Sequence, residues 1–394
     1  MRHLLARVAV HPPLTSLKAY RARIADEAPP ARDPRELANH ETSAEGRAST
    51  RGEHLGRPRS FRSNSRSSTT LVTGVTGFTG GRLAEILLDR GVKVRGLVRG
   101  DTPVEALEKS GLETIRGDLR DPDAVARAVQ GVERIYHVAA TYREGGIPEQ
   151  QYFDINVGGT RNVLDAALRY SVPSIMHTST VGVHGHIENP PGREDSPFST
   201  GDAYQESKLE AELLARKYQE EKGLPLTVVR PGPIYGPGDL RFRKLFRSIA
   251  RGHFVMVGSG EPFYHLTYVD DLCEGMILAA RSPAAVGRVY IIAGAKPVCT
   301  LNELVLRIAD VIGVKLPRWR VPFWSVYAAS VVCEALWKIL PGSPPLYPRR
   351  VEFFCKSRSF DDSRARTELG YEPKVTLEDG LRRTFEWYRS EGLL

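Results

Sequence analysis

Tyr204 and Lys208 are four positions apart in a stretch whose leucines recur at helical spacing, so their side chains are expected on one face of a helix. A tyrosine hydroxyl, with an ordinary pKa of about 10, is a poor base at neutral pH. An ammonium group one turn away favours the phenolate and lowers that pKa. The pair therefore predicts proton transfer at a hydroxyl group. Spacing alone also fits an ordinary surface contact, and the neighbouring motifs decide between the two.

A glycine-rich segment, residues 73–80, lies upstream of this pair by the distance that one nucleotide-binding domain needs. The apolar residues before it and the helical spacing of apolar residues after it, over residues 81–90, predict a strand, a tight turn and a helix. Glycines let the backbone approach a pyrophosphate, and the N–H groups of the first helical turn stabilise its charge. The segment therefore predicts a bound pyrophosphate, and together with the tyrosine–lysine pair it predicts a nicotinamide cofactor, bound through Gly74, Thr76, Gly77, Phe78, Thr79 and Gly80.

A predicted strand, residues 174–180, ends in three hydroxyl residues about twenty-five positions before Tyr204. A hydroxyl group there can hold the reacting oxygen. With the two motifs above, the chain resembles the extended short-chain dehydrogenase/reductases, the NAD(P)-dependent epimerase/dehydratase superfamily, from about Thr70 to the C-terminus. The resemblance implies that Thr180, five residues before Gly185, is the catalytic hydroxyl, with Ser179 as a neighbouring donor. Most relatives have serine at this position, and threonine offers the same donor and acceptor.

Further roles follow from the resemblance alone. Asn156, in a segment similar to the family's Asn-Val-x-Gly-Thr motif, would support the active-site strand and a proton-relay water. Three shorter matches imply contacts with the adenine ring, with the pyrophosphate and nicotinamide side, and with the carboxamide. In that order, the residues are Asp118 and Leu119, then Ala139 and Ala140, then Pro231 within residues 230–238.

The choice between NAD and NADP is predicted from the end of the second strand, residues 92–98. An acidic residue there would bind the ribose 2′-hydroxyl and reject a 2′-phosphate. This chain has Val98 followed by Arg99. A guanidinium group suits a phosphate, so the cofactor is expected to be NAD(P), with a preference for NADP. The alternative is that Arg99 lies over the adenine or points to solvent.

Residues 1–69 differ in composition from the rest of the 394-residue chain. They contain 13 of the 55 basic residues and 7 of the 47 acidic ones, which leaves 42 basic and 40 acidic residues for the remainder. The basic character therefore belongs mainly to this Arg- and Ser-rich segment, and it gives no argument for nucleic-acid binding. We interpret the segment as a disordered tail. It has no long apolar core, and its acidic residues disfavour an organellar presequence, so a mis-assigned start codon is the alternative.

The scattered cysteines indicate neither zinc nor a disulfide framework, so we expect no metal and a reducing cytoplasm. His184 and His186 flank Gly185, but two histidines do not make a metal site without further ligands. They are interpreted as loop structure or as a substrate contact. His177, inside the apolar strand, is expected in the core.

The alternation of strands and helices after the tail predicts an α/β fold, a doubly wound parallel Rossmann sheet with a smaller, interleaved C-terminal substrate-binding lobe. The Rossmann part is predicted at residues 70–238 with 265–293. The substrate lobe is predicted at residues 239–264 with 294–394. A cleft between the two would hold the substrate.

Residues 321–340 form an aromatic, amphipathic stretch in the predicted substrate lobe. Its uncharged part ends at Cys333 and is too short to span a bilayer. It is expected to cover an apolar pocket, to lie in a membrane interface as a peripheral contact, or to be a plain core helix. In position it resembles the C-terminal lobe of 3β-hydroxysteroid dehydrogenase-like members.

The leading hypothesis is an oxidoreductase that acts on a hydrophobic, sterol-like secondary alcohol, with Thr180, Tyr204, Lys208 and Asn156 at the catalytic site. A nucleotide-sugar epimerase or dehydratase can use the same residues, and its diphosphate would bind Arg241, Arg243, Lys244 and Arg247, which otherwise form a solvated helix face. A protein that binds the cofactor without turnover is the third alternative. The resemblance also implies a homodimer.

Overall fold

The computed structural model describes residues 68–394, apart from residues 101, 143–146, 318, 338–339 and 341–343. The predicted tail, except for its last two residues, lies outside the described residues. So do two residues of the predicted apolar stretch 321–340.

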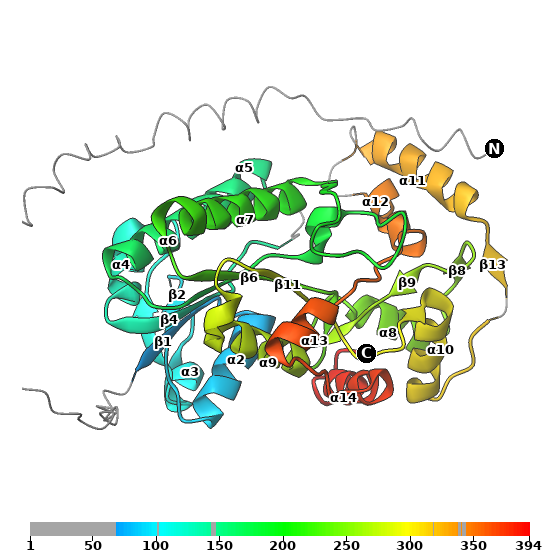
Figure 1. Cartoon of the computed structure of the whole chain (residues 1–394). Helices are drawn as coiled ribbons and strands as arrows, with labels where there is room; N and C mark the ends of the chain where they lie inside the picture. The colour runs from blue at the N-terminus through cyan, green and yellow to red at the C-terminus, as the bar shows by residue number, and fades with distance from the viewer. Residues whose placement is uncertain (1–67, 101, 143–146, 318, 338–339, 341–343) are drawn as a thin grey trace, which may run out of the picture. The chain divides into compact units, whose positions relative to one another are not determined.

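Seven strands form one parallel sheet in the order β11-β6-β5-β4-β1-β2-β3 (Figure 1). The strands are β1 (Thr69–Thr73), β2 (Lys93–Val98), β3 (Glu113–Arg116), β4 (Val132–His137), β5 (Ile175–Thr178), β6 (Leu226–Pro231) and β11 (Val289–Ile292). The chain runs outward from β1 to β3 and then returns to build the other half from β4. Such a reversal of strand order leaves a crevice at the carboxyl ends of the strands, where open α/β sheets bind ligands. The predicted doubly wound parallel sheet is confirmed.

Helices cover both faces of the sheet because neighbouring strand residues point to opposite sides. Leu71, Ile135 and Ile175 pack under α4 (Pro122–Val129), α6 (Gly159–Arg169) and α7 (Ala203–Lys222). Val72, Tyr136 and Met176 pack on the other face, under α2 (Phe78–Asp89) and α9 (Val269–Arg281). The shorter helices of this part are α3 (Glu105–Lys109), α5 (Glu149–Phe153) and the turns η3 (Asp154–Gly158), η4 (Val181–His184) and η5 (Pro283–Ala285).

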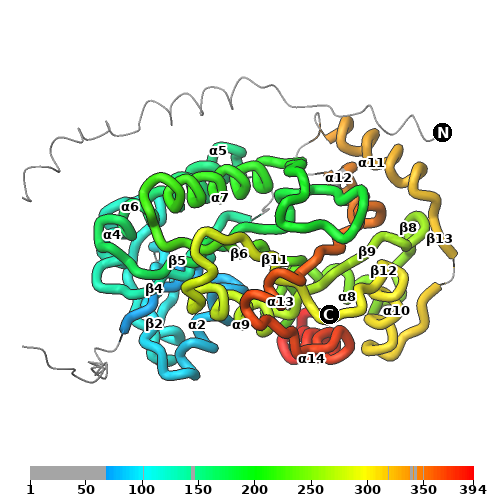
Figure 2. The backbone as a smooth tube through the Cα atoms, in the orientation of Figure 1, coloured from blue at the N-terminus to red at the C-terminus, as the bar shows by residue number. Residues whose placement is uncertain are grey.

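A smaller set of elements has its own apolar core. It includes α8 (Arg243–Ala250), α10 (Leu301–Ile312) and α14 (Leu377–Ser390), and α10 contacts both of the others (Figure 2). Short strand pairs lie among them: β7 (Ile234–Tyr235) with β10 (Thr267–Tyr268), β9 (Phe263–Tyr264) with β12 (Cys299–Thr300), and β8 (Met256–Val257) with β13 (Arg320–Val321). The remaining helices are α11 (Phe323–Trp337), α12 (Pro348–Val351), η6 (Glu352–Phe354) and α13 (Ser363–Leu369). These elements alternate with α9 and β11 along the chain, while the boundaries of the two predicted parts stay a prediction.

Helix α11 differs from its prediction as an amphipathic or core helix. Ser330 is its only buried side chain within the described residues, and its apolar residues are distributed around the whole helix. Amphipathicity was the wrong interpretation because apolar residues that surround a helix form no separate apolar face.

Candidate active site

The predicted site residues gather at one edge of the central sheet. All except Asn156, Tyr204 and Lys208, which lie on helical segments, follow or end a parallel strand, so their positions meet at the carboxyl ends of those strands. They are the glycine loop after β1, Arg99 after β2, Asp118 and Leu119 after β3, Ala139 and Ala140 after β4, Thr180 after β5, and Pro231 at the end of β6.

The glycine loop leaves the N-terminus of α2 open. Gly77 precedes this helix and provides no side-chain cap for its first N–H groups. Gly74 has φ +79°, and a Cβ there would lie 2.9 Å from the Cα atom of Ala139. A Cβ on Gly80 would lie 2.2 Å from the carbonyl oxygen of Gly74. Because only glycine fits this tight turn onto a helix N-terminus, the loop fits a bound pyrophosphate. Thr76 is exposed, and Phe78 and Thr79 are half-buried.

Arg99 is exposed directly after β2 and acts electrostatically on Asp118, which follows the neighbouring strand β3. The carboxylate of Asp118 accepts two hydrogen bonds, each 2.9 Å, from the guanidinium of Arg120. This contact holds the pKa of Asp118 below its ordinary value; burial opposes the effect, and Arg99 adds a smaller lowering. Two cations therefore lie at the end of the sheet where the adenosine part of a dinucleotide would be placed.

Helix α7 carries both Tyr204 and Lys208. It begins after Asp202, whose carboxylate caps it by accepting a 2.6 Å hydrogen bond from the backbone of Gln205. Lys208 is 3% exposed, and its ammonium donates a 2.6 Å hydrogen bond to the carbonyl oxygen of Thr178. Burial lowers the pKa of Lys208 to about 8, against an opposing effect of Glu212. The helical prediction for this pair is confirmed, and Lys208 is not a surface residue.

Thr180 lies two residues beyond the carbonyl that holds Lys208. It caps η4, and its hydroxyl oxygen accepts a 3.0 Å hydrogen bond from the backbone of Gly182. A hydroxyl group that accepts one hydrogen bond still has its own proton to donate. Because η4 packs on α7 and Lys208 binds the end of β5, the fold brings Thr180 close to the tyrosine–lysine pair. Ser179 is buried, with no hydrogen-bond partner for its hydroxyl among the described residues.

Asn156 lies in η3, a π-helical turn between α5 and α6. Its side-chain amide donates to the hydroxyl of Ser207, at 2.9 Å, and to the carbonyl of Thr141, at 3.2 Å. Its side-chain oxygen accepts from the backbone N–H of Thr141 at 2.8 Å. Both donors of the amide are therefore used, and Asn156 connects the segment after β4 to α7 beside Lys208. The structure gives this residue a supporting position, and the proton-relay role stays a prediction.

A buried polar row crosses the sheet beneath α6 and α7. Thr73, His137 and His177 are in register on β1, β4 and β5. The hydroxyl of Thr160 donates to the Asn156 carbonyl at 2.6 Å, so it must accept from Nε2 of His137, 2.9 Å away. Nδ1 of His137 then accepts from Thr73 at 2.9 Å. This neutral tautomer agrees with burial, which lowers the pKa of His137 to about 3. His177 is fully buried, as predicted.

A buried ion pair was missed by the sequence analysis. The guanidinium of Arg230, on β6, binds both carboxylate oxygens of Glu212, one turn beyond Lys208 on α7. It also donates to Nε2 of His184, at 3.0 Å, and to the carbonyl of Glu194, at 2.7 Å. His184 belongs to η4, so this clamp joins the helix of Lys208 to the turn that follows Thr180. Arg230 was part of a noted motif, but no sequence signal singled out Glu212.

Aromatic contacts around Tyr204 were also missed. The ring centroids of Tyr204 and Tyr142 are 4.9 Å apart, in an edge-on arrangement. The guanidinium of Arg241 lies 5.5 Å from the ring centroid of Tyr142 and 5.6 Å from that of Phe78, and it is bound by Asp239. Arg241 thus connects the smaller lobe to the glycine loop and to the neighbour of Tyr204.

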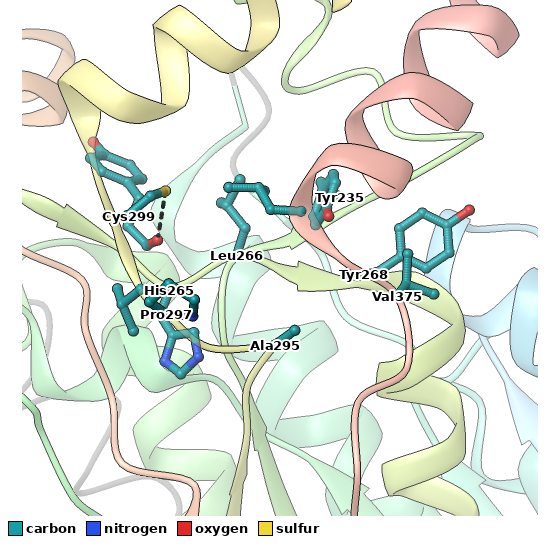
Figure 3. A pocket seen from close by; sticks show the side chains of 11 residues that line it. Tyr235, His265, Leu266, Tyr268, Ala295, Pro297, Cys299 and Val375 are labelled. Atoms are coloured by element: carbon teal, nitrogen blue, oxygen red, sulfur yellow. Dashed lines mark hydrogen bonds between the residues drawn. The ribbon is translucent and has the colours of Figure 1, made fainter.

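The pocket in Figure 3 lies away from these residues. It is lined by β7, β9, β10 and nearby segments, and its lining includes Tyr235, Tyr264 and His265 but not Thr180, Tyr204 or Lys208. The candidate active site is therefore located by the positions of the motif residues and not by this pocket. Among the described residues, no group of three or more His, Cys, Asp or Glu side chains is arranged to hold a metal ion. Over the same residues, no helix is both long and apolar enough to cross a bilayer.

A parallel sheet with this strand reversal, an open glycine loop and a Tyr-x-x-x-Lys helix with a buried lysine is typical of the extended short-chain dehydrogenase/reductases. The sequence pattern of the NAD dependent epimerase/dehydratase family matches residues 70–293, more than half of the chain. The chain belongs to this family, and it is an NAD(P)-dependent enzyme of the extended short-chain dehydrogenase/reductase type.

Relatives within this family catalyse different reactions. The 3 beta-hydroxysteroid dehydrogenase/Delta 5-->4-isomerase of Mycobacterium tuberculosis is 33% identical over 81% of this chain and 90% of its own. An N-acetyl-alpha-D-glucosaminyl-diphospho-ditrans,octacis-undecaprenol 4-epimerase of Escherichia coli O157:H7 is 30% identical over 80% of this chain and 94% of its own. The UDP-glucuronic acid 4-epimerase of Bacillus cereus, solved with NAD, has the same fold. Its TM-score is 0.66 at 24% identity, over 82% of this chain and 99% of that one.

Proposed function

We propose that the protein interconverts a secondary alcohol and a ketone on a hydrophobic, sterol-like substrate, in the manner of the 3β-hydroxysteroid dehydrogenases. In the oxidative direction, Tyr204 takes the hydroxyl proton, Thr180 donates a hydrogen bond to the same oxygen, and Lys208 stabilises the phenolate. The nicotinamide cofactor, when bound, accepts the hydride from the carbinol carbon. The observation that carries the proposal is the buried ammonium of Lys208, held 2.6 Å from the Thr178 carbonyl beside the strand end that bears Thr180.

The hydrophobic substrate class is supported by two independent features. The name of the Mycobacterium tuberculosis relative contains an apolar substrate, a steroid, whereas the Escherichia coli relative is named as a 4-epimerase of a sugar joined through a diphosphate to a polyprenol, so its name also fits the epimerase alternative. The smaller lobe of this chain also exposes the apolar helix α11.

The main alternative is a nucleotide-sugar epimerase, in which the same residues oxidise and then reduce a bound sugar. The cation best placed to bind its diphosphate is Arg241, near Tyr142. Arg241 is already bound to Asp239 at 2.6 Å, which favours a packing role and weighs against this alternative.

The cofactor is proposed to be NADP, because Arg99 follows β2 with no acidic residue at the strand end and lies near Asp118. A homodimer, a cytoplasmic location and peripheral membrane contact through residues 321–340 complete the proposal.

The deciding experiment measures net cofactor reduction by the purified full chain, with NAD+ and NADP+ separately, on 3β-hydroxysterols and on UDP-sugars. Net reduction with a sterol is expected, and Tyr204→Phe should lower kcat by about 10²- to 10⁴-fold. Tyr218→Phe is the matched control, since Tyr218 lies on the same helix and donates to Asp165 away from the site. Epimer formation from a UDP-sugar without net reduction would instead establish the epimerase.

A further inference from the structure

Helix α11 exposes several large apolar side chains to solvent. Trp324 is 73% exposed, Val332 59% and Leu336 52%, and Tyr327 and Val331 are also exposed. Figure 1 shows the helix, in orange, at the edge of the smaller lobe, where it packs against α12. Monomeric soluble proteins rarely expose a contiguous apolar surface of this kind unless it binds something.

Within residues 70–394, the excess of basic over acidic residues lies in the stretch of sequence that contains the same helix. Residues 313–358 contain eight basic and two acidic residues, a net charge of +6. The rest of residues 70–394 contains 34 basic and 38 acidic residues, a net charge of −4. Two of the cations, Lys315 and Arg320, precede α11, and Arg350 and Lys356 follow it. The segment with the exposed apolar helix is therefore cationic on an otherwise acidic body.

We propose that α11 and its cationic flanks form a docking surface for an anionic lipid bilayer. Fifteen helical residues extend about 22 Å, which is shorter than the roughly 30 Å hydrocarbon core, so the helix would lie in the interface and not cross it. Apolar residues around the helix enter the headgroup and acyl boundary, Trp324 suits this depth, and the flanking cations bind lipid phosphates. The inference rests on the membrane contact of the proposed function and names its lipid partner, and it does not depend on the reaction that the enzyme catalyses.

A second copy of the chain fits the same surface less well. In a twofold dimer, identical patches face each other, so one segment of net charge +6 would meet another. Such a contact places like charges opposite each other, whereas an anionic bilayer neutralises them.

The test is co-sedimentation of the full chain with vesicles of phosphatidylcholine alone and of phosphatidylcholine with phosphatidylglycerol, at low and high salt. Binding is expected to the anionic vesicles, and salt should weaken it. Val332→Asp with Leu336→Asp should abolish binding. Arg320→Glu with Arg350→Glu should weaken it about tenfold or more.

Leu306→Asp, at an exposed leucine of α10, is the matched control and should bind normally. The unfolding midpoint of each variant, measured alongside, identifies any that fail to fold. Equal binding to neutral and anionic vesicles would overturn the proposal, as would unchanged binding by the α11 variant. A concentration-dependent dimer that the same variant abolishes, with no vesicle binding, would assign the surface to a second copy.

Discussion

Lys208→Met is expected to abolish catalysis without destabilising the fold. Burial lowers the pKa of Lys208 from its ordinary 10.5 to about 8. At 1.36 kcal/mol per pH unit, keeping the ammonium charged inside the folded protein at neutral pH costs about 3 kcal/mol. Methionine avoids this cost but also loses the hydrogen bond to Thr178, which contributes about 1.5–3 kcal/mol to the stability of the wild type. At pH 7.5 the variant should therefore be equal to the wild type in its free energy of unfolding, or up to about 2 kcal/mol more stable.

The difference in free energy of unfolding between the wild type and Lys208→Met should depend on pH, because only the wild type has the buried ammonium. Between about pH 8 and 10.5, the unfolded chain keeps the Lys208 proton while the folded protein releases it. Stability rises with pH wherever the unfolded state binds more protons, so the wild type gains stability through this window and loses it as the pH falls through 8. From pH 7.5 to 9.5, the wild type should gain about 2 kcal/mol relative to Lys208→Met.

Urea unfolding followed by circular dichroism at pH 7.5, 8.5 and 9.5 measures the difference. Lys217→Met is the matched control, because Lys217 is an exposed lysine on the same helix. Its difference from the wild type should stay constant with pH. A Lys208→Met difference that is equally constant would refute the assignment of a buried, charged lysine.

Three further predictions concern neighbouring residues. Thr180→Ser should keep activity, whereas Thr180→Ala should lose it, as measured by kcat. Thr180→Ala should also lose about 1 kcal/mol of stability in urea unfolding, because it removes the cap on η4. Glu212→Gln should destabilise the protein by about 3–5 kcal/mol because it leaves the buried Arg230 charge unpaired. Adding Arg230→Met to the same chain should restore part of the lost stability. Full stability of Glu212→Gln alone would contradict the ion pair between Glu212 and Arg230. Arg99→Ala should raise the KM for NADP+ more than that for NAD+, and equal changes would remove the basis for the NADP preference.

The parts of the site that the sequence predicted are those that depend on local spacing. Tyr204 and Lys208 share a helix face because they are one turn apart, and the glycine loop is one continuous segment. Thr180 and Asn156 could be selected because the family resemblance assigns positions within short motifs. A parallel sheet places the carboxyl ends of its strands at the same side, so the strand pattern alone predicts that the motifs which follow these strands lie together.

The clamp and the exposed helix could not be predicted for two different physical reasons. Glu212 and Arg230 meet only when α7 packs over β6, and a charged residue in an ordinary helical stretch gives no sign of complete burial. The apolar composition of α11 reports hydrophobicity but not environment, because a core helix and a membrane-surface helix can have the same residues.

The buried charges around α7 are arranged as the proposed mechanism requires. Arg230 is matched by the carboxylate of Glu212 through two hydrogen bonds, so this pair contributes little net charge at the site. The hydrogen bond from Lys208 goes instead to a neutral carbonyl oxygen, which leaves its positive charge largely uncompensated. A positive charge near a tyrosine hydroxyl favours its phenolate, and Tyr204 lies one helical turn from Lys208. The ion pair thus fixes the helix without neutralising the ammonium to which the proposed mechanism assigns the stabilisation of the Tyr204 phenolate.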